Sequence, residues 1–352
     1  MTIQVIDAPQ AMARLDAFSA VIDARSPSEY AEDHLPCAVN WPVLDDGERH
    51  TIGVEYKQIS AFEAQKRGAA LVARNIARHI ERHVMDQPKS WRPLVYCWRG
   101  GKRSGSLAWF LDQMGFRTHV LEGGYKAFRG AVIHALAELP GQFGFRVVCG
   151  RTGSGKTRLL AALREAGAQV LDLEEIARHR GSVLGMLPGR PQPSQKAFET
   201  ALWDTLRRFD PARPVFVESE SRKIGNLRLP EALILRMREH GECVRVEMPD
   251  AGRLELLLED YAFLIDDPEL LCRLLEALIP LRGRETVRGW QAMARAGEVP
   301  AVFTALMHEH YDPGYLRSMQ ANFAGFSGAR VLELPDPGPE AMRAAAGALI
   351  GP

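Results

Sequence analysis

Short apolar segments alternate with longer amphipathic segments along most of the chain. The short segments, bounded by polar or glycine-rich residues, predict buried strands at residues 21–25, 94–96, 118–121, 145–149, 169–173, 214–218 and 331–334. The amphipathic segments predict helices, chiefly over residues 55–85, 106–114 and 251–311. Because strands alternate with helices, we expect an α/β protein built on parallel sheets, with active sites beyond the carboxyl ends of the strands.

A turn that contains Pro140 and Gly141 separates two such patterns. The chain has 352 residues, which is enough for two hydrophobic cores. We therefore predict a first α/β domain over residues 1–139 and a second over residues 140–352, the second with a helical region. A stretch rich in glycine and proline, residues 181–195, is too long for a simple connector and predicts a functional loop.

The strand at residues 94–96 leads into a cysteine in a basic, glycine-containing loop, and the helical pattern resumes at Ser106. The loop reads Cys97, Trp98, Arg99, Gly100, Gly101, Lys102, Arg103 and Ser104. Nearby cations and a helix N-terminus favour a thiolate at Cys97. The C-x5-R spacing to Arg103 suits a cradle in which backbone N–H groups and a guanidinium hold a tetrahedral anion. The alternative is a strand-end cysteine that packs as a small apolar residue.

Two chemistries share this loop geometry. One is phosphate-ester hydrolysis through a phosphocysteine, and the other is transfer of sulfur or selenium as a persulfide or selenosulfide. Hydrolysis requires a carboxylic acid that protonates the leaving alcohol. No residue near the loop in sequence clearly supplies one, although Asp23 or Glu122 could approach the loop in space.

A second glycine-rich loop follows the strand at residues 145–149 and precedes an amphipathic helix. It comprises Gly150, Arg151, Thr152, Gly153, Ser154, Gly155, Lys156 and Thr157, the G-x-x-x-x-G-K-T pattern of a P-loop. Such a loop binds a di- or triphosphate, and Thr157 is the expected ligand if Mg²⁺ is present. Asp172 and Glu218 are candidate carboxylates for this site, and each has the alternative of capping a loop.

Charge and cysteine content narrow the functional classes. The number of lysine and arginine residues equals the number of aspartate and glutamate residues. Basic residues are nevertheless in excess over residues 146–238, and acidic residues are in excess over residues 239–281. This distribution suits a polyanion on one face, or reflects unevenly charged solvated helices. Five scattered cysteines without a C-x-x-C pair argue against a disulfide scaffold and a zinc site. With no secretory signal or membrane-spanning apolar run, we expect a cytoplasmic protein without a membrane partner.

The first domain resembles rhodanese domains. The resemblance rests on residues 23–30 and 34–40, on the Cys97 loop and on residues 121–125. Cys37 stands where rhodaneses usually carry glycine. The loop is one residue longer than in simple sulfurtransferases and matches the C-x5-R loop of related dual-specificity phosphatases, which suits a phosphate-bearing donor.

A rhodanese domain followed by a P-loop domain resembles the tRNA 2-selenouridine synthase family. Residues 97–104, 150–157 and 54–57, together with Gly68, carry this resemblance. It implies that selenium replaces sulfur at C2 of a wobble-position 2-thiouridine in tRNA. It also implies selenophosphate as donor, Cys97 as covalent selenium carrier and an S-geranyl intermediate made from geranyl diphosphate.

The residues fit this assignment, with the basic segment 146–238 tracking an RNA backbone. We expect the P-loop to serve geranyl diphosphate rather than ATP hydrolysis, no tightly bound cofactor, and a protein that supplies selenophosphate as a further partner. Two alternatives remain at this point. One is a C-x5-R phosphatase or sulfurtransferase fused to a P-loop kinase-like domain; the other is a P-loop kinase whose rhodanese module is an inactive binding platform.

Overall fold

The computed structural model describes residues 3–351. The chain forms two compact units, which we call the N-terminal and C-terminal units. The N-terminal unit contains the chain up to Ala135 together with Pro193–Asp204, and the C-terminal unit contains Leu136–Gln192 and the chain from Thr205 onwards.

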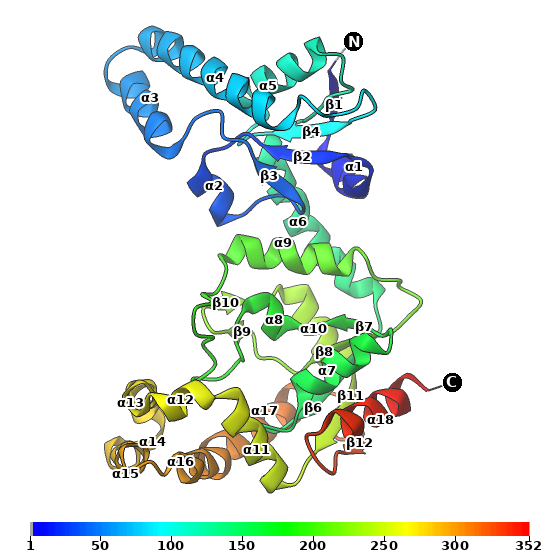
Figure 1. Cartoon of the computed structure of the whole chain (residues 1–352). Coiled ribbons are helices and arrows are strands. Elements are labelled where there is room, and N and C mark those ends of the chain that lie inside the picture. The colour runs from blue at the N-terminus through cyan, green and yellow to red at the C-terminus, as the bar shows by residue number, and fades with distance from the viewer. Residues whose placement is uncertain (1–2, 352) are drawn as a thin grey trace. The chain divides into compact units, whose positions relative to one another are not determined.

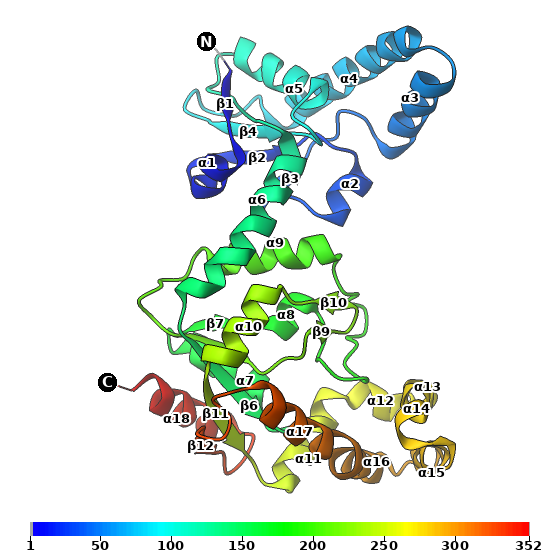
Figure 2. The same cartoon turned by 180° about the vertical axis from the view of Figure 1, so that it is seen from behind.

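A five-stranded parallel sheet forms the centre of the N-terminal unit. Its strand order is β1-β5-β4-β2-β3. The strands are β1 (Gln4–Ile6), β2 (Ala20–Asp23), β3 (Ala38–Asn40), β4 (Pro93–Tyr96) and β5 (His119–Leu121). Figures 1 and 2 show helices α4 and α5 on one side of this sheet and α6 on the other. The middle strand β4 is buried along its length, so the loop after it, which begins at Cys97, emerges from the centre of the sheet.

The helices of this unit begin where local capping signals place them. They are η1 (Leu15–Ala17), α1 (Ala8–Ala13), α2 (Pro27–Glu32), α3 (Asp46–Gln58), α4 (Ala61–His83), α5 (Lys102–Gln113) and α6 (Gly124–Glu138). Ser26 and Glu29 form a capping box at the start of α2, as its sequence indicates. The prediction that the helix after the Cys97 loop begins at Ser106 is wrong. It begins at Lys102, directly after Gly101, so that Lys102, Arg103 and Ser104 belong to its first turn.

The long helical pattern around residues 55–85 contains a break. The chain turns at Ile59 and Ser60, and the Ser60 side chain caps α4 by accepting a hydrogen bond from the Glu63 N–H. Gly68 does not interrupt α4. It lies against α3, where an added Cβ would meet the Ile52 side chain at 3.4 Å, so this glycine allows the two helices to pack closely.

The C-terminal unit contains a second five-stranded parallel sheet, in the order β12-β11-β6-β8-β7. The strands are β6 (Phe145–Gly150), β7 (Gln169–Leu171), β8 (Val215–Glu218), β11 (Glu242–Glu247) and β12 (Arg330–Glu333), with a separate antiparallel pair, β9 (Lys223–Ile224) and β10 (Leu227–Arg228). Strand β11 was absent from the predicted elements. It lies beside β6 and places β6, the strand that precedes the P-loop, in the middle of the sheet.

Helices cover both faces of this sheet and extend beyond it. They are η2 (Leu139–Gln142), α7 (Lys156–Glu165), α8 (Leu173–Ala177), α10 (Glu231–His240), α11 (Asp250–Asp260), α12 (Ala262–Asp266), α13 (Pro268–Leu275), η3 (Glu276–Leu278), α14 (Ile279–Arg282), α15 (Arg284–Arg295), α16 (Val299–Ala305), η4 (Leu306–Tyr311), α17 (Asp312–Asn322) and α18 (Pro339–Ile350). Figures 1 and 2 show α7 and α18 on one face of the sheet and α10 on the other. The helices from α11 to α16 enclose an apolar cluster of their own, which contains Leu275, Trp290 and Phe303. The segment predicted to be helical, residues 251–311, is therefore confirmed.

Helix α9 (Gln195–Leu206) lies in sequence between β7 and β8, but most of it packs on the N-terminal unit. Thr200 Oγ1 donates to Asp33 Oδ2 at 2.9 Å, Glu199 forms an ion pair with Arg129, and the ring centroids of Trp203 and Phe128 are 5.6 Å apart. This division differs from the single predicted boundary between residues 139 and 140. Within residues 3–351, no helix combines the length and apolar character needed to cross a bilayer.

Candidate functional site

Cys97 follows β4 directly, and its side chain is only 3% exposed. The hydroxyl of Ser104, in the first turn of α5, donates a hydrogen bond to Cys97 Sγ at 3.2 Å. The structure thus brings together two residues of the predicted anion-binding loop, and it gives the sulfur a polar neighbour in an otherwise apolar core.

The Cys97 loop is held by the first turn of α6. The backbone N–H groups of Tyr125 and Lys126 donate to the carbonyls of Cys97 and Trp98, at 2.8 and 3.0 Å. Gly124 has φ +58°, and a Cβ at this position would lie 2.2 Å from the Cys97 carbonyl oxygen. No other residue fits there without moving the loop. The motif at residues 121–125 was visible in the sequence, but its role as an anchor for the loop was not.

Arg103 forms an ion pair with a carboxylate that the sequence analysis did not identify. Its Nη1 lies 2.7 Å from Glu29 Oε2, and Arg49 Nε lies 3.1 Å from the same oxygen. Burial tends to raise the pKa of Glu29, but the hydrogen bond and charge of Arg103 outweigh it, so the pKa is lowered. Glu29 therefore holds Arg103 in place as an ionised partner. Arg99 and Lys102 are exposed beside it.

The two carboxylates proposed as acids for ester hydrolysis are placed differently. Asp23 is completely buried and forms an ion pair with Arg25, whose Nη2 is 2.6 Å from Asp23 Oδ2. Glu122 is exposed. Asp23 is therefore committed to a structural pair and is a poor proton donor for a leaving group at Cys97. Cys37, at the usual glycine position, has φ +59°, which explains why glycine suits that position.

The P-loop joins β6 to α7. Gly153 and Gly155 have φ +76° and +80°, and an added Cβ on Gly153 would lie 2.8 Å from the Arg253 carbonyl oxygen. Lys156 Nζ donates to the carbonyls of Gly150 and Arg151, at 2.6 and 3.2 Å. Burial lowers the pKa of Lys156, and the charge of Glu174 is the first of the effects that oppose this. The loop's own carbonyls thus hold the ammonium group.

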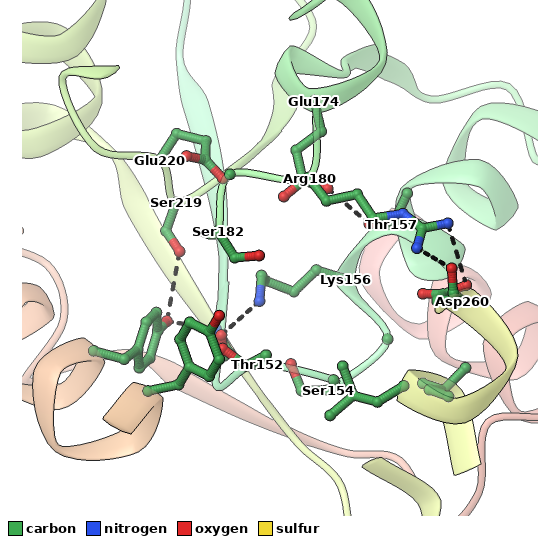
Figure 3. Close-up of a pocket in the computed structure, with 18 of the residues that line it drawn as sticks. Thr152, Ser154, Lys156, Thr157, Glu174, Arg180, Ser182, Ser219, Glu220 and Asp260 are labelled. Atoms are coloured by element: carbon green, nitrogen blue, oxygen red, sulfur yellow. Dashed lines mark hydrogen bonds and ion pairs between the residues drawn. The ribbon is translucent and has the colours of Figure 1, made fainter. Parts of the chain in front are cut away.

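The P-loop forms one wall of a cavity of about 470 Å³. Figure 3 shows Lys156 in the middle of this cavity, with Glu174, Ser182 and Glu220 on one side and Thr152 and Ser154 on the other. The remaining wall comes from α11, η4 and α17 and is mostly apolar. Its apolar and aromatic residues are Leu256, Leu257, Tyr261, Tyr311, Tyr315, Met319 and Phe323, and Asp260, His310 and Ser318 add polar side chains. Seven of the eight predicted P-loop residues line the cavity; the eighth, Arg151, pairs with Asp312 at 3.3 Å.

The two candidate carboxylates have structural contacts. Asp172 caps α8 by accepting from the Glu175 N–H at 2.9 Å and pairs with Arg164. Glu218 Oε1 accepts from the Glu174 N–H at 2.7 Å. The glutamates that line the cavity are instead Glu174 and Glu220, which the sequence analysis did not identify. Burial, followed by the charge of Glu174, raises the pKa of Glu220 to about 8.

The oxygen donors near Thr157 suit a hard cation only in part. Thr157 Oγ1 is 3.3 Å from Glu174 Oε2. Among residues 3–351, no three histidine, cysteine or acidic side chains are arranged to hold a metal ion. Mg²⁺ usually takes one or two protein oxygens and completes its shell with phosphate oxygens and water. Thr157 and Glu174 fit that arrangement, in which a phosphate ligand supplies the other donors.

A buried arginine behind the P-loop fixes its backbone. Arg253 of α11 is fully buried, and its Nε donates to the Thr152 carbonyl at 3.0 Å. Its Nη1 and Nη2 donate to the two carboxylate oxygens of Asp312, at 2.9 and 2.6 Å. Because Arg253 and Asp312 lie far from the P-loop in sequence, the pattern of residues 150–157 gave no sign of them.

Both units match known proteins, and the relatives of the chain belong to one family. A rhodanese-like domain model matches residues 7–131, and a model described as the tRNA 2-selenouridine synthase AAA domain matches residues 143–269. A tRNA 2-selenouridine synthase of Shewanella denitrificans is 35% identical over 267 residues, which cover 74% of this chain and 70% of that protein. The chain belongs to the tRNA 2-selenouridine synthase family. The family resemblance and the predicted order of the two α/β folds are therefore confirmed.

Other relatives match over a slightly smaller share of their length. The tRNA 2-selenouridine synthase of Nitrosomonas europaea is 36% identical over 249 residues, which cover 70% of this chain and 64% of that protein. The chain thus spans just under two thirds of this family member. A rhodanese-related protein from Thermoplasma volcanium matches 36% of this chain and 92% of its own, with 17% identity and a TM-score of 0.25.

Proposed function

We propose that this protein replaces sulfur by selenium at C2 of a wobble-position 2-thiouridine in tRNA. The observation that carries this proposal is the buried Cys97 in an anchored C-x5-R loop, in a chain whose relatives are named for 2-selenouridine synthesis. The separate cavity at the P-loop supports a reaction in two steps, each with its own phosphorus-containing substrate.

The first step is S-geranylation of the base. The sulfur of 2-thiouridine attacks C1 of geranyl diphosphate, and the C1–O bond breaks with its electron pair going to diphosphate. The base loses its N3 proton to solvent or to a carboxylate. Lys156 and the P-loop N–H groups hold the leaving diphosphate, whose developing charge they stabilise. Where Mg²⁺ is bound, it adds charge neutralisation, with Thr157 and Glu174 as its protein ligands.

The second step transfers selenium. The Cys97 thiolate first exchanges with a small disulfide and becomes a mixed disulfide. Water attacks the phosphorus of selenophosphate, and the P–Se bond breaks with its electron pair on selenium, which gives phosphate and selenide. The selenide attacks Cys97 Sγ and expels the small thiolate, which forms a selenosulfide at Cys97. The selenium then attacks C2 of the S-geranyl base and expels geranylthiolate. A small thiol cleaves the remaining S–Se bond as reductant, which leaves 2-selenouridine and a mixed disulfide at Cys97. In this step the Ser104 hydroxyl donates a hydrogen bond to the Cys97 sulfur, and the Arg103 guanidinium binds the oxyanion of the donor.

The apolar wall of the cavity favours geranyl diphosphate over ATP as the P-loop substrate. Four of its residues, Leu256, Leu257, Met319 and Phe323, offer no strong hydrogen-bonding group to a ribose or a base. Competition binding tests this assignment. Geranyl diphosphate should displace a labelled pyrophosphate probe more effectively than ATP does, and tight ATP binding that geranyl diphosphate fails to displace would contradict it.

We propose that tRNA phosphates contact the exposed Arg99 and Lys102 beside the Cys97 loop. Several cations of the basic segment 146–238 pair with acids outside that segment, among them Arg151 with Asp312 and Arg158 with Glu259. The charge excess of that segment is thus partly neutralised within the protein. A selenophosphate-supplying protein partner stays a prediction.

The decisive test of the overall activity is nucleoside mass spectrometry. Unmodified 2-thiouridine tRNA is incubated with the protein, selenophosphate, geranyl diphosphate, Mg²⁺ and a thiol. We expect S-geranyl-2-thiouridine followed by 2-selenouridine. Turnover of an aryl phosphate without either nucleoside would instead support the phosphatase alternative.

A further inference from the structure

A small apolar recess extends from the P-loop cavity into the helical region. It opens beside Thr152 and Ser182, and it shares Tyr261 and Tyr311 with the main cavity. Its free volume is about 10 Å³, which is close to the space that a single water occupies. The lining is almost entirely aliphatic and aromatic, so the recess suits the end of an apolar group and not a polar one.

The far end of the recess is a rigid part of the protein core. Phe303, Leu306 and Met307 line it, and each is at most 2% exposed. All three belong to the apolar cluster of the helical region. Leu306 and Met307 are in η4, a π-helical segment that also carries Tyr311. Because π-helical turns are rare and occur mostly at functional sites, this segment is an unusual choice for a purely structural wall.

We propose that this recess is the end-stop for the hydrocarbon chain of the diphosphate substrate and thereby selects its length. The proposal rests on the proposed function, which places the diphosphate on the P-loop. The diphosphate end is fixed by Lys156, so the floor at Phe303 and Met307 limits how many carbons fit behind it. A hydrocarbon chain that reaches this floor meets side chains that cannot move without disturbing the core, so a longer chain is excluded.

Binding of a chain-length series tests this inference in the intact protein. Inorganic pyrophosphate and dimethylallyl, geranyl and farnesyl diphosphates compete with labelled pyrophosphate. The unmodified protein should prefer geranyl over farnesyl diphosphate by at least about tenfold, since a closed apolar pocket discriminates against added carbons. Met307→Ala should reduce that preference by about tenfold or reverse it. Leu275→Ala, which opens the same apolar cluster away from the recess, is the matched control and should leave the preference unchanged.

A second variant keeps the test valid if Met307→Ala does not fold. Ser182 is half-buried in a loop at the mouth of the recess, so Ser182→Phe narrows the entrance without opening the core. It should weaken geranyl diphosphate binding by about tenfold or more and leave pyrophosphate binding unchanged. If Met307→Ala keeps the preference of the unmodified protein for geranyl over farnesyl diphosphate, or if Ser182→Phe binds geranyl diphosphate as tightly as the unmodified protein, the end-stop is wrong. If the unmodified protein binds pyrophosphate but gains nothing from a geranyl group, the proposed P-loop substrate is wrong instead.

Discussion

The two anion-binding loops have the same place in their sheets but opposite surroundings. Each follows the middle strand of a parallel sheet and leads into a helix. The first contains a buried nucleophile, Cys97, with exposed cations beside it; the second contains a half-buried cation, Lys156, and no cysteine in the motif. The difference indicates that the first loop is built to react with its ligand and the second to hold one.

The acids near the two loops differ in the same way. Glu29 is ionised beside Arg103, and its pKa is lowered. Glu174 and Glu220 share a buried cavity with a single lysine, and their pKa values are raised, by burial first and then by other charges. The first loop therefore has an ionised acid beside Arg103, whereas burial disfavours the charged form of the two acids beside Lys156.

Replacing the nucleophile should have the largest effect and separates the two loops most sharply. Cys97→Ala should reduce selenation by about 10³-fold or more, because the covalent step has no other nucleophile. Formation of S-geranyl-2-thiouridine should continue at a rate near that of the unmodified protein. Quantifying both nucleosides in one reaction checks this, and equal loss of the two would refute the division of labour.

The lysine of the second loop should show the converse pattern. Lys156→Ala should lower geranylation by about 10²- to 10³-fold, the usual loss when a group that stabilises the leaving anion is removed. Selenation of tRNA that already carries S-geranyl-2-thiouridine should be little affected. Supplying that tRNA directly is the control, and a defect that persists with it would contradict the prediction.

Breaking the buried ion pair behind the P-loop should act mainly on the free energy of unfolding. Arg253→Met leaves Asp312 buried without its main partner and should lower the free energy of unfolding by about 3–5 kcal/mol. The matched control is Arg158→Met, which removes a cation that pairs with Glu259 at the surface and should change stability by less than about 1 kcal/mol. Urea unfolding of both variants gives the comparison, and equal midpoints would refute the structural role of Arg253.

The raised pKa of Glu220 predicts a pH dependence. Folded protein keeps a proton on Glu220 up to about pH 8, whereas the unfolded chain releases it near the ordinary value of about 4.3. The free energy of unfolding therefore falls as pH rises through this window. Glu220→Gln should remove this contribution to the pH dependence of the free energy of unfolding. The variant should therefore gain stability relative to the unmodified protein as the pH rises. Denaturation at several pH values tests it, and parallel profiles for both proteins would contradict the assignment.

The smallest expected effect concerns Cys37, which lies outside both loops. Its positive φ strains any residue with a Cβ, so Cys37→Gly should stabilise the protein by about 1 kcal/mol. Cys37→Ala keeps the strain and removes the thiol, which makes it the appropriate control. If thermal unfolding shows both variants equally stable, the backbone is not the cause.

The sequence predicted the parts of each site that are contiguous in the chain. The strand, glycines and basic residues around Cys97, and the whole P-loop motif, could be read because local backbone requirements restrict which residues occur there. The contacts that Glu29, Gly124 and Arg253 make with these loops could not be predicted, because each residue reaches its loop from a distant element. Strand β11 was missed because Arg245 and two glutamates interrupt its apolar pattern. Most of helix α9 belongs to the N-terminal unit because of tertiary contacts, such as that of Thr200 with Asp33, which the sequence does not reveal.

Intact-protein mass spectrometry tests the central claim most directly, with Cys97 first converted to a mixed disulfide with a small thiol and the protein then exposed briefly to selenophosphate. The account predicts one selenium atom on the protein, located at Cys97 by peptide mapping, absent in Cys97→Ala and removed by added thiol. A phosphate group on Cys97, or an unmodified protein under conditions that produce 2-selenouridine, would show that this cysteine does not carry selenium to the tRNA.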